Sequence, residues 1–210
     1  MLEQFIKNRI KQELPFVANE GQTELLDKLS HFITSTTPRK AFILRGYAGT
    51  GKTSIMAALV GALQQLQQRV ILLAPTGRAA KVLSRYAHMP AYTIHKYIYR
   101  QKQLGEQTFT LNDNLHKHTL FIVDEASMIS GVREHSNFGS GMLLDDLVRY
   151  VYSGEGCSML LLGDDAQLPP VGSIVSPALS TDYMSGYGLE VSEHTLTEVA
   201  RQALDSGILQ

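Results

Sequence analysis

The sequence is poor in the residues that mark secreted, metal-binding or membrane proteins. It contains one cysteine, Cys157, which excludes an internal disulfide and a cysteine-based zinc site. We expect Cys157 to be a small core residue in a reducing compartment. No apolar run reaches the roughly 18 residues of a membrane-spanning helix, and the amphipathic, charged start differs from a secretory signal. These absences predict a cytoplasmic protein without a membrane partner.

The sequence also lacks an excess of either charge, because 19 Lys and Arg residues are balanced by 20 Asp and Glu residues. The net charge of -1 gives no overall basic field, so contact with nucleic acid would require a local patch. With 210 residues, 44% of them hydrophobic and 19% charged, the chain has the composition of a folded protein. The length favours one large domain or one domain with a small insertion.

The apolar runs that are present are short and lack the polar alternation of half-exposed strands. Such runs are typical of strands that are buried on both faces of a parallel sheet. Helical patterns at residues 53–66 and 79–86 lie between them. The runs cover residues 41–44, 70–74, 120–123 and 159–162, with a fifth strand expected at 194–199. This alternation predicts an α/β fold with a doubly wound, mostly parallel sheet.

Two helices are expected before the first strand. They should cover residues 2–12 and 20–33, and Asn19 is the candidate N-cap of the second. We therefore divide the chain into N-terminal helices at residues 1–36 and a main domain at residues 37–210.

Three polar segments interrupt the main domain. Residues at about 100–118 predict a small inserted hairpin, with a short strand at 107–111 beside turn-forming Asn and Asp residues. Segments 130–141 and 181–188 are rich in Gly, Ser, Asn and Tyr and predict surface loops.

The clearest motif is a glycine-rich run between the first strand and the helix that follows it. It matches G-x-x-x-x-G-K-[ST] in the strand and helix context that phosphate binding requires. Backbone N–H groups can close around phosphates, Lys52 supplies positive charge, and the Thr53 hydroxyl is suited to ligate Mg²⁺. The predicted site for ATP and Mg²⁺ comprises Gly46, Tyr47, Ala48, Gly49, Thr50, Gly51, Lys52, Thr53 and Ser54.

An acidic pair, Asp124 and Glu125, follows the third apolar run. A P-loop needs a carboxylate on its metal, normally from a neighbouring strand end, and Asp124 meets this need. Glu125 is the candidate to orient or deprotonate the attacking water, which suits hydrolysis better than transfer to a second substrate. A small-molecule kinase is therefore disfavoured, although an acidic pair can also end a strand without a chemical role.

A third polar segment, residues 163–172, follows the fourth apolar run. In a parallel sheet the strand ends share one edge, so Gln167 is placed to reach a γ-phosphate and to act in catalysis. The segment is also rich in proline and serves as an exit loop.

In their order along the chain, six segments resemble the helicase motifs of RecD/Dda-like superfamily-one DNA helicases. The resemblance extends over residues 19–202 and implies an N-terminal RecA-like motor domain. The segments are GYAGTGKT at 46–53, APTGRAAK at 74–81, TIH at 93–95, VDEASM at 123–128, GDDAQLPPVG at 163–172 and LTEVARQ at 196–202.

The resemblance implies two further nucleotide contacts. Gln22 resembles the glutamine that recognises adenine, and Arg201 resembles the arginine placed on the γ-phosphate. Such an arginine raises the rate constant of phosphoryl transfer by a factor of roughly 10³ to 10⁵. Without these roles, Gln22 is an ordinary helical residue and Arg201 an ordinary surface arginine.

The resemblance also implies contacts with single-stranded DNA. A helix N-terminus with a hydroxyl and a positive charge suits backbone-directed binding that ignores base sequence. The alternative for His95 is a structural role, in which it caps a helix or packs against neighbouring side chains. The 100–118 hairpin either splits the duplex or is a loop without a role. The candidate contacts are Pro75, Thr76, Arg78 and His95.

Superfamily-one motors bind ATP between two RecA-like domains, and the members of this family move 5′ to 3′. Neither a second P-loop-like sheet nor a later motif follows the arginine segment. We therefore expect a fragment of a longer helicase, which binds nucleotide weakly on its own and does not translocate. The alternative is a P-loop ATPase subunit of a nuclease or remodelling complex without unwinding activity of its own. A subunit resembling the α subunit of exodeoxyribonuclease V, in recombination and DNA repair, overlaps with the helicase interpretation because such a subunit is itself a motor.

Overall fold

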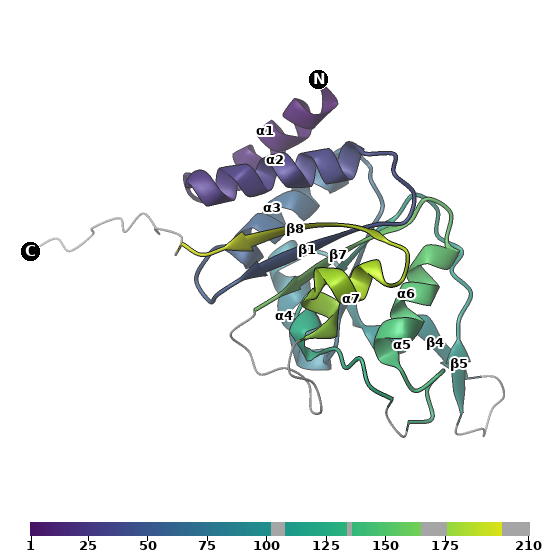
Figure 1. The fold of residues 1–210 in the computed structure, drawn as a ribbon. Coiled ribbons are helices and arrows are strands. Elements are labelled where there is room, and N and C mark those ends of the chain that lie inside the picture. Colours follow the sequence, from purple (N-terminus) through teal and green to yellow (C-terminus); the bar gives the residue numbers. More distant parts are fainter. Residues whose placement is uncertain (102–107, 134–135, 165–175, 199–210) are drawn as a thin grey trace, which may run out of the picture.

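The computed structural model describes residues 1–101, 108–133, 136–164 and 176–198. These residues form a central sheet with helices on both faces (Figure 1). Among the described helices, none is long and apolar enough to cross a membrane.

The sheet has six strands, all paired in parallel, in the order β3-β2-β6-β7-β1-β8. The prediction of a doubly wound parallel sheet is therefore confirmed. The strands are β1 (Lys40–Gly46), β2 (Val70–Ala74), β3 (Ala91–Thr93), β6 (Leu120–Val123), β7 (Ser158–Gly163) and β8 (Glu190–Leu196).

Alternate side chains of the inner strands enter two separate cores. In β1, Phe42 and Leu44 pack on one face of the sheet, and Ala41 and Ile43 pack on the other. Burial of each large apolar side chain contributes about 1.5 to 3 kcal/mol, so both faces need a helical layer. The absence of polar alternation in the apolar runs follows directly from this arrangement.

Each face is covered by its own set of helices (Figure 1). The first face is covered by α1 (Leu2–Glu13), α2 (Glu20–Thr34), α3 (Lys52–Gln65) and α4 (Gly77–Ala87). The second is covered by α5 (Ile94–Ile98), α6 (Leu143–Ser153), α7 (Thr181–Ser185) and the 3-10 turns η1 (Ala126–Met128) and η2 (Pro177–Leu179).

Helix α2 starts at the expected N-cap. The Asn19 side chain accepts from the Gln22 N–H at 2.8 Å, and the Gln22 side chain accepts from the Asn19 N–H at 3.0 Å. This reciprocal capping box satisfies two donors that a helix start otherwise leaves unpaired, and such a cap is worth about 1 kcal/mol.

Several elements differ from the sequence-based expectation. Strand β8 starts at Glu190, four residues before the expected residue 194. Its first residues were missed because this edge strand mixes polar and apolar residues and gives no continuous apolar run. Segment 181–188, expected to be a loop, contains helix α7, which Ser180 caps by accepting from the Tyr183 N–H. The strand β3 and the helices α5 and α6 were not predicted.

The inserted hairpin is present as a pair of short antiparallel strands, and its residues 102–107 lie outside the described chain. Its base packs on the 136–141 segment: the rings of Phe109 and Phe138 stack with centroids 4.5 Å apart, and the Phe109 N–H donates to the Asn137 carbonyl oxygen at 2.8 Å. The strands are β4 (Tyr99–Gln101) and β5 (Phe109–Leu111).

A buried carboxylate ties this hairpin to helix α6. Asp146 is 4% exposed, and its Oδ2 atom accepts from the Tyr99 hydroxyl at 2.6 Å and from the Ser140 N–H at 2.9 Å. A Cβ on Gly139 would lie 2.1 Å from the same oxygen, so only glycine fits beside it. Asp146 thus joins the hairpin, the 136–141 segment and α6 at one point.

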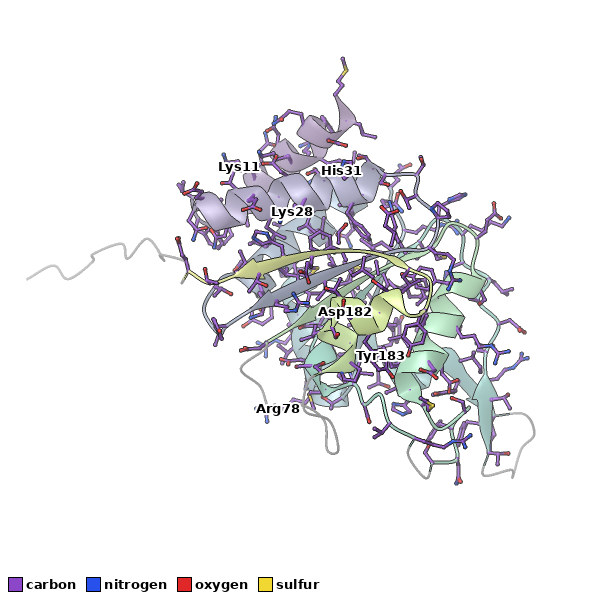
Figure 2. All side chains as sticks on the ribbon, viewed as in Figure 1. Lys11, Lys28, His31, Arg78, Asp182 and Tyr183 are labelled. Carbon is purple, nitrogen blue, oxygen red and sulfur yellow. The ribbon has the colours of Figure 1, made fainter. Side chains whose placement is uncertain are left out.

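We predict that Asp146→Ala lowers the free energy of unfolding by about 1 to 3 kcal/mol, because the buried Tyr99 hydroxyl and the part-buried Ser140 N–H lose their acceptor. Urea denaturation measures the change. Asp182→Ala is the matched control, since Asp182 is exposed on α7 (Figure 2) and its loss should cost no more than about 0.5 kcal/mol. Equal effects of the two substitutions would contradict the assigned role of Asp146.

Candidate nucleotide-binding site

Three neighbouring strands bring the predicted nucleotide motifs to one edge of the sheet. Strand β7 lies between β1 and β6, with Arg45 paired to Gly163 and Val123 paired to Leu161. The P-loop follows β1 and Asp124 follows β6, so both leave the sheet on the same side. Parallel pairing causes this grouping, because it gathers all carboxyl ends at one edge.

The P-loop turns tightly after β1. Gly49 and Gly51 have φ angles of 80° and 90°, which residues with a Cβ rarely adopt. A Cβ on Gly46 would lie 2.8 Å from Thr50 Oγ1 and 3.0 Å from the Leu196 carbonyl oxygen. The glycines therefore create a cradle of backbone at the end of β1, which fits a chain of phosphates.

Helix α3 presents its N-terminus to this cradle. Its N-cap is Gly51, and no side chain among the described residues caps it, which leaves N–H groups of the first turn for an anion. Thr53 is exposed in this turn and Ser54 is half-buried. The exposed part of the loop consists of Tyr47, Ala48 and Gly49.

The Lys52 ammonium lies over the loop. Its Nζ atom donates to the Tyr47 carbonyl oxygen at 2.9 Å and also to the Gly46 carbonyl oxygen. The positive charge of Lys52 lowers the pKa of Asp124, against the larger effect of burial. Lys52 and Asp124 therefore act on each other electrostatically, although Lys52 begins α3 and Asp124 follows β6.

Gln22 contacts the P-loop directly. Its side chain is 1% exposed, and its Nε2 atom donates to the Thr50 carbonyl oxygen at 3.0 Å, while its Oε1 atom serves the cap of α2. Helix α2 is thereby attached to the loop, 28 residues further along the chain. The predicted adenine contact and the P-loop thus lie together in the fold, and the Gln22 amide has one N–H and one lone pair left.

Asp124 and Glu125 occupy the turn after β6. The Asp124 N–H donates to the Leu73 carbonyl oxygen at 3.0 Å, and the Glu125 N–H donates to Asp124 Oδ1 at 2.9 Å. Glu125 has a φ angle of 53°, a conformation that costs a residue with a Cβ on the order of 1 kcal/mol or more. Backbone strain of this kind is typical of functional sites.

Burial raises the pKa of the Asp124 carboxyl above its ordinary value of 3.8, and the neighbouring Glu125 charge also raises it. A cation at this carboxylate would supply compensating charge. In the described ranges, no group of three or more His, Cys, Asp or Glu side chains could hold a metal ion. A Mg²⁺ ion would therefore be held by Asp124 and Thr53 together with phosphate oxygens, as is usual for this cation.

Two predicted catalytic residues, Gln167 and Arg201, lie outside the described residues. The described chain stops at Asp164 after β7, resumes at Ser176, and ends just after β8. Because β7 and β8 flank β1, both undescribed segments leave from strands beside the P-loop strand.

The two predicted DNA-binding segments follow neighbouring strands. Ala74, the last residue of β2, pairs with Thr93, the last residue of β3. Pro75 and Thr76 therefore leave the sheet beside the start of α5, at the same edge as the P-loop. Thr76 and Thr93 also act as N-caps, since their side chains accept from the first turns of α4 and α5.

The other two DNA candidates have different surroundings. Arg78 is exposed in the first turn of α4 and points away from the body of the domain (Figure 2). His95 is half-buried, and its ring centroid lies 5.1 Å from that of Phe138 and 5.8 Å from that of Tyr99. Arg78 is accessible to a phosphate, whereas His95 packs in the aromatic cluster at the base of the hairpin.

Sequence reasoning missed Arg45, whose guanidinium joins the P-loop strand to Glu193 in β8 at 2.7 Å. The available signal was an arginine directly between the apolar run 41–44 and Gly46. A charged side chain at the end of an inner strand is partly removed from water, so it is expected to need hydrogen-bond or ion-pair partners.

Comparison with known proteins places this site in a family. The family model described as AAA domain matches residues 17–208. The ATP-dependent RecD2 DNA helicase of Deinococcus radiodurans is 31% identical over 193 residues, covering 91% of this chain and 23% of that protein. The ATP-dependent DNA helicase dda of Enterobacteria phage T4 is 30% identical over 167 residues, covering 75% of this chain and 34% of that protein.

A solved structure shares the fold. The crystal structure of the Pif1 helicase from Candida albicans has a TM-score of 0.55 and 19% identity, covering 89% of this chain and 41% of that chain. This chain spans well under half the length of each of these relatives.

We predict that Asp124→Asn raises the melting temperature at neutral pH. A raised pKa means that ionisation of Asp124 costs the folded state more than the unfolded state. In the wild type this costs stability progressively as pH rises from 3.8 through the raised folded-state pKa, and the loss persists at higher pH. The asparagine variant lacks that loss and can still accept the Glu125 N–H bond.

Thermal denaturation of the nucleotide-free chain between acid and neutral pH tests this. Asp182→Asn, on an exposed residue, should leave the melting temperature unchanged. A lower melting temperature for Asp124→Asn at neutral pH would contradict the prediction.

Proposed function

The chain belongs to the AAA domain family, and we propose that it is the ATP-binding motor domain of a DNA helicase, in which ATP hydrolysis drives movement along single-stranded DNA. Its relatives include the RecD2 and dda helicases and the ATP-dependent DNA helicase Pif1 of Psychrobacter. The proposed direction of movement, 5′ to 3′, rests on the resemblance to RecD/Dda-like enzymes alone.

One observation carries this proposal: the nucleotide motifs and a predicted DNA segment leave adjacent strands at the same edge of the sheet. Strand β6 carries Asp124, and its neighbour β2 leads into Pro75 and Thr76. The bond from the Asp124 N–H to the Leu73 carbonyl oxygen joins the two strand ends. This bond continues the parallel pairing of β2 and β6, so the turn with Asp124 and the segment that starts at Pro75 leave from adjoining strand ends.

Each side chain of the nucleotide site has a proposed task. Lys52 neutralises the terminal phosphates, Thr53 and Asp124 hold Mg²⁺, and Glu125 orients the water that attacks. Bound Mg²⁺ would neutralise charge on the phosphates. Gln167 and Arg201 contact the γ-phosphate, and Gln22 recognises the adenine from the base of α2.

The distribution of charge supports a DNA partner. Residues 28–105 contain 12 of the 19 Lys and Arg residues and not one Asp or Glu, which supplies cations for a local patch within a chain of nearly neutral charge. On α4, Arg78, Lys81 and Arg85 are exposed and form no ion pair with any described residue. Unpaired surface cations of this kind bind phosphates irrespective of base sequence.

The hairpin is proposed to meet the junction between duplex and single strand. Its base is fixed by the Asp146 carboxylate and by the stacked Phe109 and Phe138 rings, which supports a fixed attachment of this element to the domain. His95 belongs to the same aromatic cluster, so its proposed DNA contact and the hairpin share one support.

A second RecA-like domain is part of the proposal for the whole protein. Superfamily-one motors close a second domain over the nucleotide, and here Tyr47, Ala48, Gly49 and Thr53 remain exposed around the P-loop. Tyr47 is 51% exposed, which supports a surface that another domain covers.

The alternative function is a P-loop ATPase subunit of a nuclease or remodelling complex without unwinding activity. It requires the same nucleotide residues but has no need of the basic α4 surface. DNA-stimulated ATP hydrolysis favours the motor, and hydrolysis that is indifferent to DNA favours the alternative.

We predict that Lys52→Ala lowers the DNA-stimulated ATPase rate of the full-length protein by at least about a hundredfold, because the phosphates lose a fixed positive charge. The rate is measured with and without single-stranded DNA. Lys117→Ala is the control, since the Lys117 ammonium pairs with Glu155 at the surface. A stimulated rate that survives Lys52→Ala would place the chemistry elsewhere.

We also predict that Arg78→Ala weakens binding to single-stranded DNA of any sequence and reduces the salt dependence of binding by about one unit of log–log slope. Fluorescence anisotropy across a salt series measures both. Lys11→Ala makes the same change of charge on α1, at the opposite side of the domain (Figure 2), and should leave the slope as it is. Identical slopes for the two variants would remove Arg78 from the DNA path.

A further inference from the structure

The outer surface of helix α4 combines cations with large apolar side chains. Its inner side consists of Ala80, Leu83 and Ala87, which are buried. Val82 is 44% exposed and Tyr86 is 56% exposed, and between them along the helix lie cations that are exposed as well. The helix contains not one Asp or Glu, so its cations lack the i,i+4 carboxylate partners that stabilise many surface helices. The exposed side chains are Arg78, Lys81, Val82, Arg85 and Tyr86.

These side chains form two separate strips along the helix. Successive residues are about 100° apart around a helix axis, so the three cations share an arc of about 60°. Val82 and Tyr86 are four residues apart and therefore lie one above the other, in the adjoining arc. We call the first arc, Arg78, Lys81 and Arg85, the cationic strip, and the second, Val82 and Tyr86, the apolar strip.

An unpaired nucleic-acid strand has the same division of chemistry. Its phosphates carry negative charge, and its bases present flat faces on which aromatic side chains stack. Duplex DNA also presents phosphates, but its base faces are stacked inside the helix and cannot meet a side chain unless the base is flipped out. A single strand therefore fits both strips, whereas a duplex fits only the cationic strip.

A single exposed Val or Tyr is ordinary on a protein surface. Here the apolar strip lies directly beside unpaired cations, and the two strips continue a segment that is already predicted to contact DNA. Pro75 and Thr76 precede α4, and the Thr76 side chain caps it. Arg78 lies in the first turn, where the helix dipole favours an anion, and Arg85 lies about 10 Å further along the axis.

We propose that the outer surface of α4 is a stacking platform for single-stranded DNA, on which Tyr86 contacts a base while the cationic strip holds the phosphates. The inference rests on the proposed function and deepens it, because it adds a base contact to a surface that so far had phosphate contacts alone. Recognition remains independent of base sequence, since every base has a face on which an aromatic ring can stack.

A fluorescent reporter can test the contact directly. The chain contains no tryptophan, so Tyr86→Trp places a single indole ring in the apolar strip. Oligo(dT) added to this variant of the 210-residue chain should change the tryptophan fluorescence in a saturable way, because a base stacks on the ring. Blunt duplex DNA of the same length should cause little change.

Tyr183→Trp is the matched control for the reporter. Tyr183 is 40% exposed, but it lies on α7, which packs on the opposite face of the sheet from α4 (Figure 2). Its fluorescence should not respond to oligo(dT) at concentrations that saturate the response of Tyr86→Trp.

Affinity measurements separate the two strips. Tyr86→Ala should weaken binding of oligo(dT) about tenfold, the effect of losing one stacked base, and leave the salt dependence unchanged because no charge is lost. Arg85→Ala should instead lower the log–log salt slope by about one unit. Tyr86→Phe keeps the aromatic face and should bind like the wild type. An abasic oligonucleotide, which has phosphates without bases, should bind the wild type and Tyr86→Ala equally.

The possible outcomes are distinct. An unchanged Tyr86→Trp fluorescence at saturating oligo(dT), an equal response to duplex DNA, or a wild-type affinity in Tyr86→Ala overturns the stacking role and leaves the apolar strip to a protein partner. DNA binding through the cations then still stands. A wild-type chain that binds no oligo(dT) even at low salt contradicts the proposed function itself and this inference with it.

Discussion

The parallel pairing of β1, β7 and β6 is the constraint on which the site depends. It places the P-loop, Asp164 and Asp124 at one edge although they are far apart in sequence, and it requires helices on both faces to bury the inner strands. The order β2-β6-β7-β1 extends the same edge to the segment that starts at Pro75. Nucleotide and DNA segments are therefore neighbours through the sheet itself, before any second domain is considered.

Much of this arrangement could be predicted, because the signals are local. The apolar runs 70–74 and 120–123 coincide with β2 and β6, since strands that are buried on both faces form continuous apolar runs in the sequence. Strand β8 was placed too late because its outer positions are polar, and α7 was missed because a five-residue helix depends on its Ser180 cap. The contacts of Arg45 and the bond from Gln22 to Thr50 join residues far apart in sequence, which no local pattern reveals.

The site is built at some expense of stability. Asp124 is buried against its preference for water, and Glu125 adopts a backbone conformation that favours glycine. Lys52 donates to two carbonyl oxygens of the P-loop. Elsewhere the fold compensates with satisfied groups, such as the capping box of α2 and the Asp146 carboxylate.

The position of Gln22 has a consequence for motion within the domain. The same amide closes the first turn of α2 and holds the Thr50 carbonyl oxygen of the P-loop. An adenine ring that took over the bond to Thr50 would release the helix from the loop, and one that took over the bond from the Asn19 N–H would open the cap of α2. In either case the backbone amides of the first turn of α2 would exchange with solvent more readily. Binding of the base would thus change the local unfolding of the N-terminal layer, where α1 packs on α2, and leave the shape of the domain unchanged.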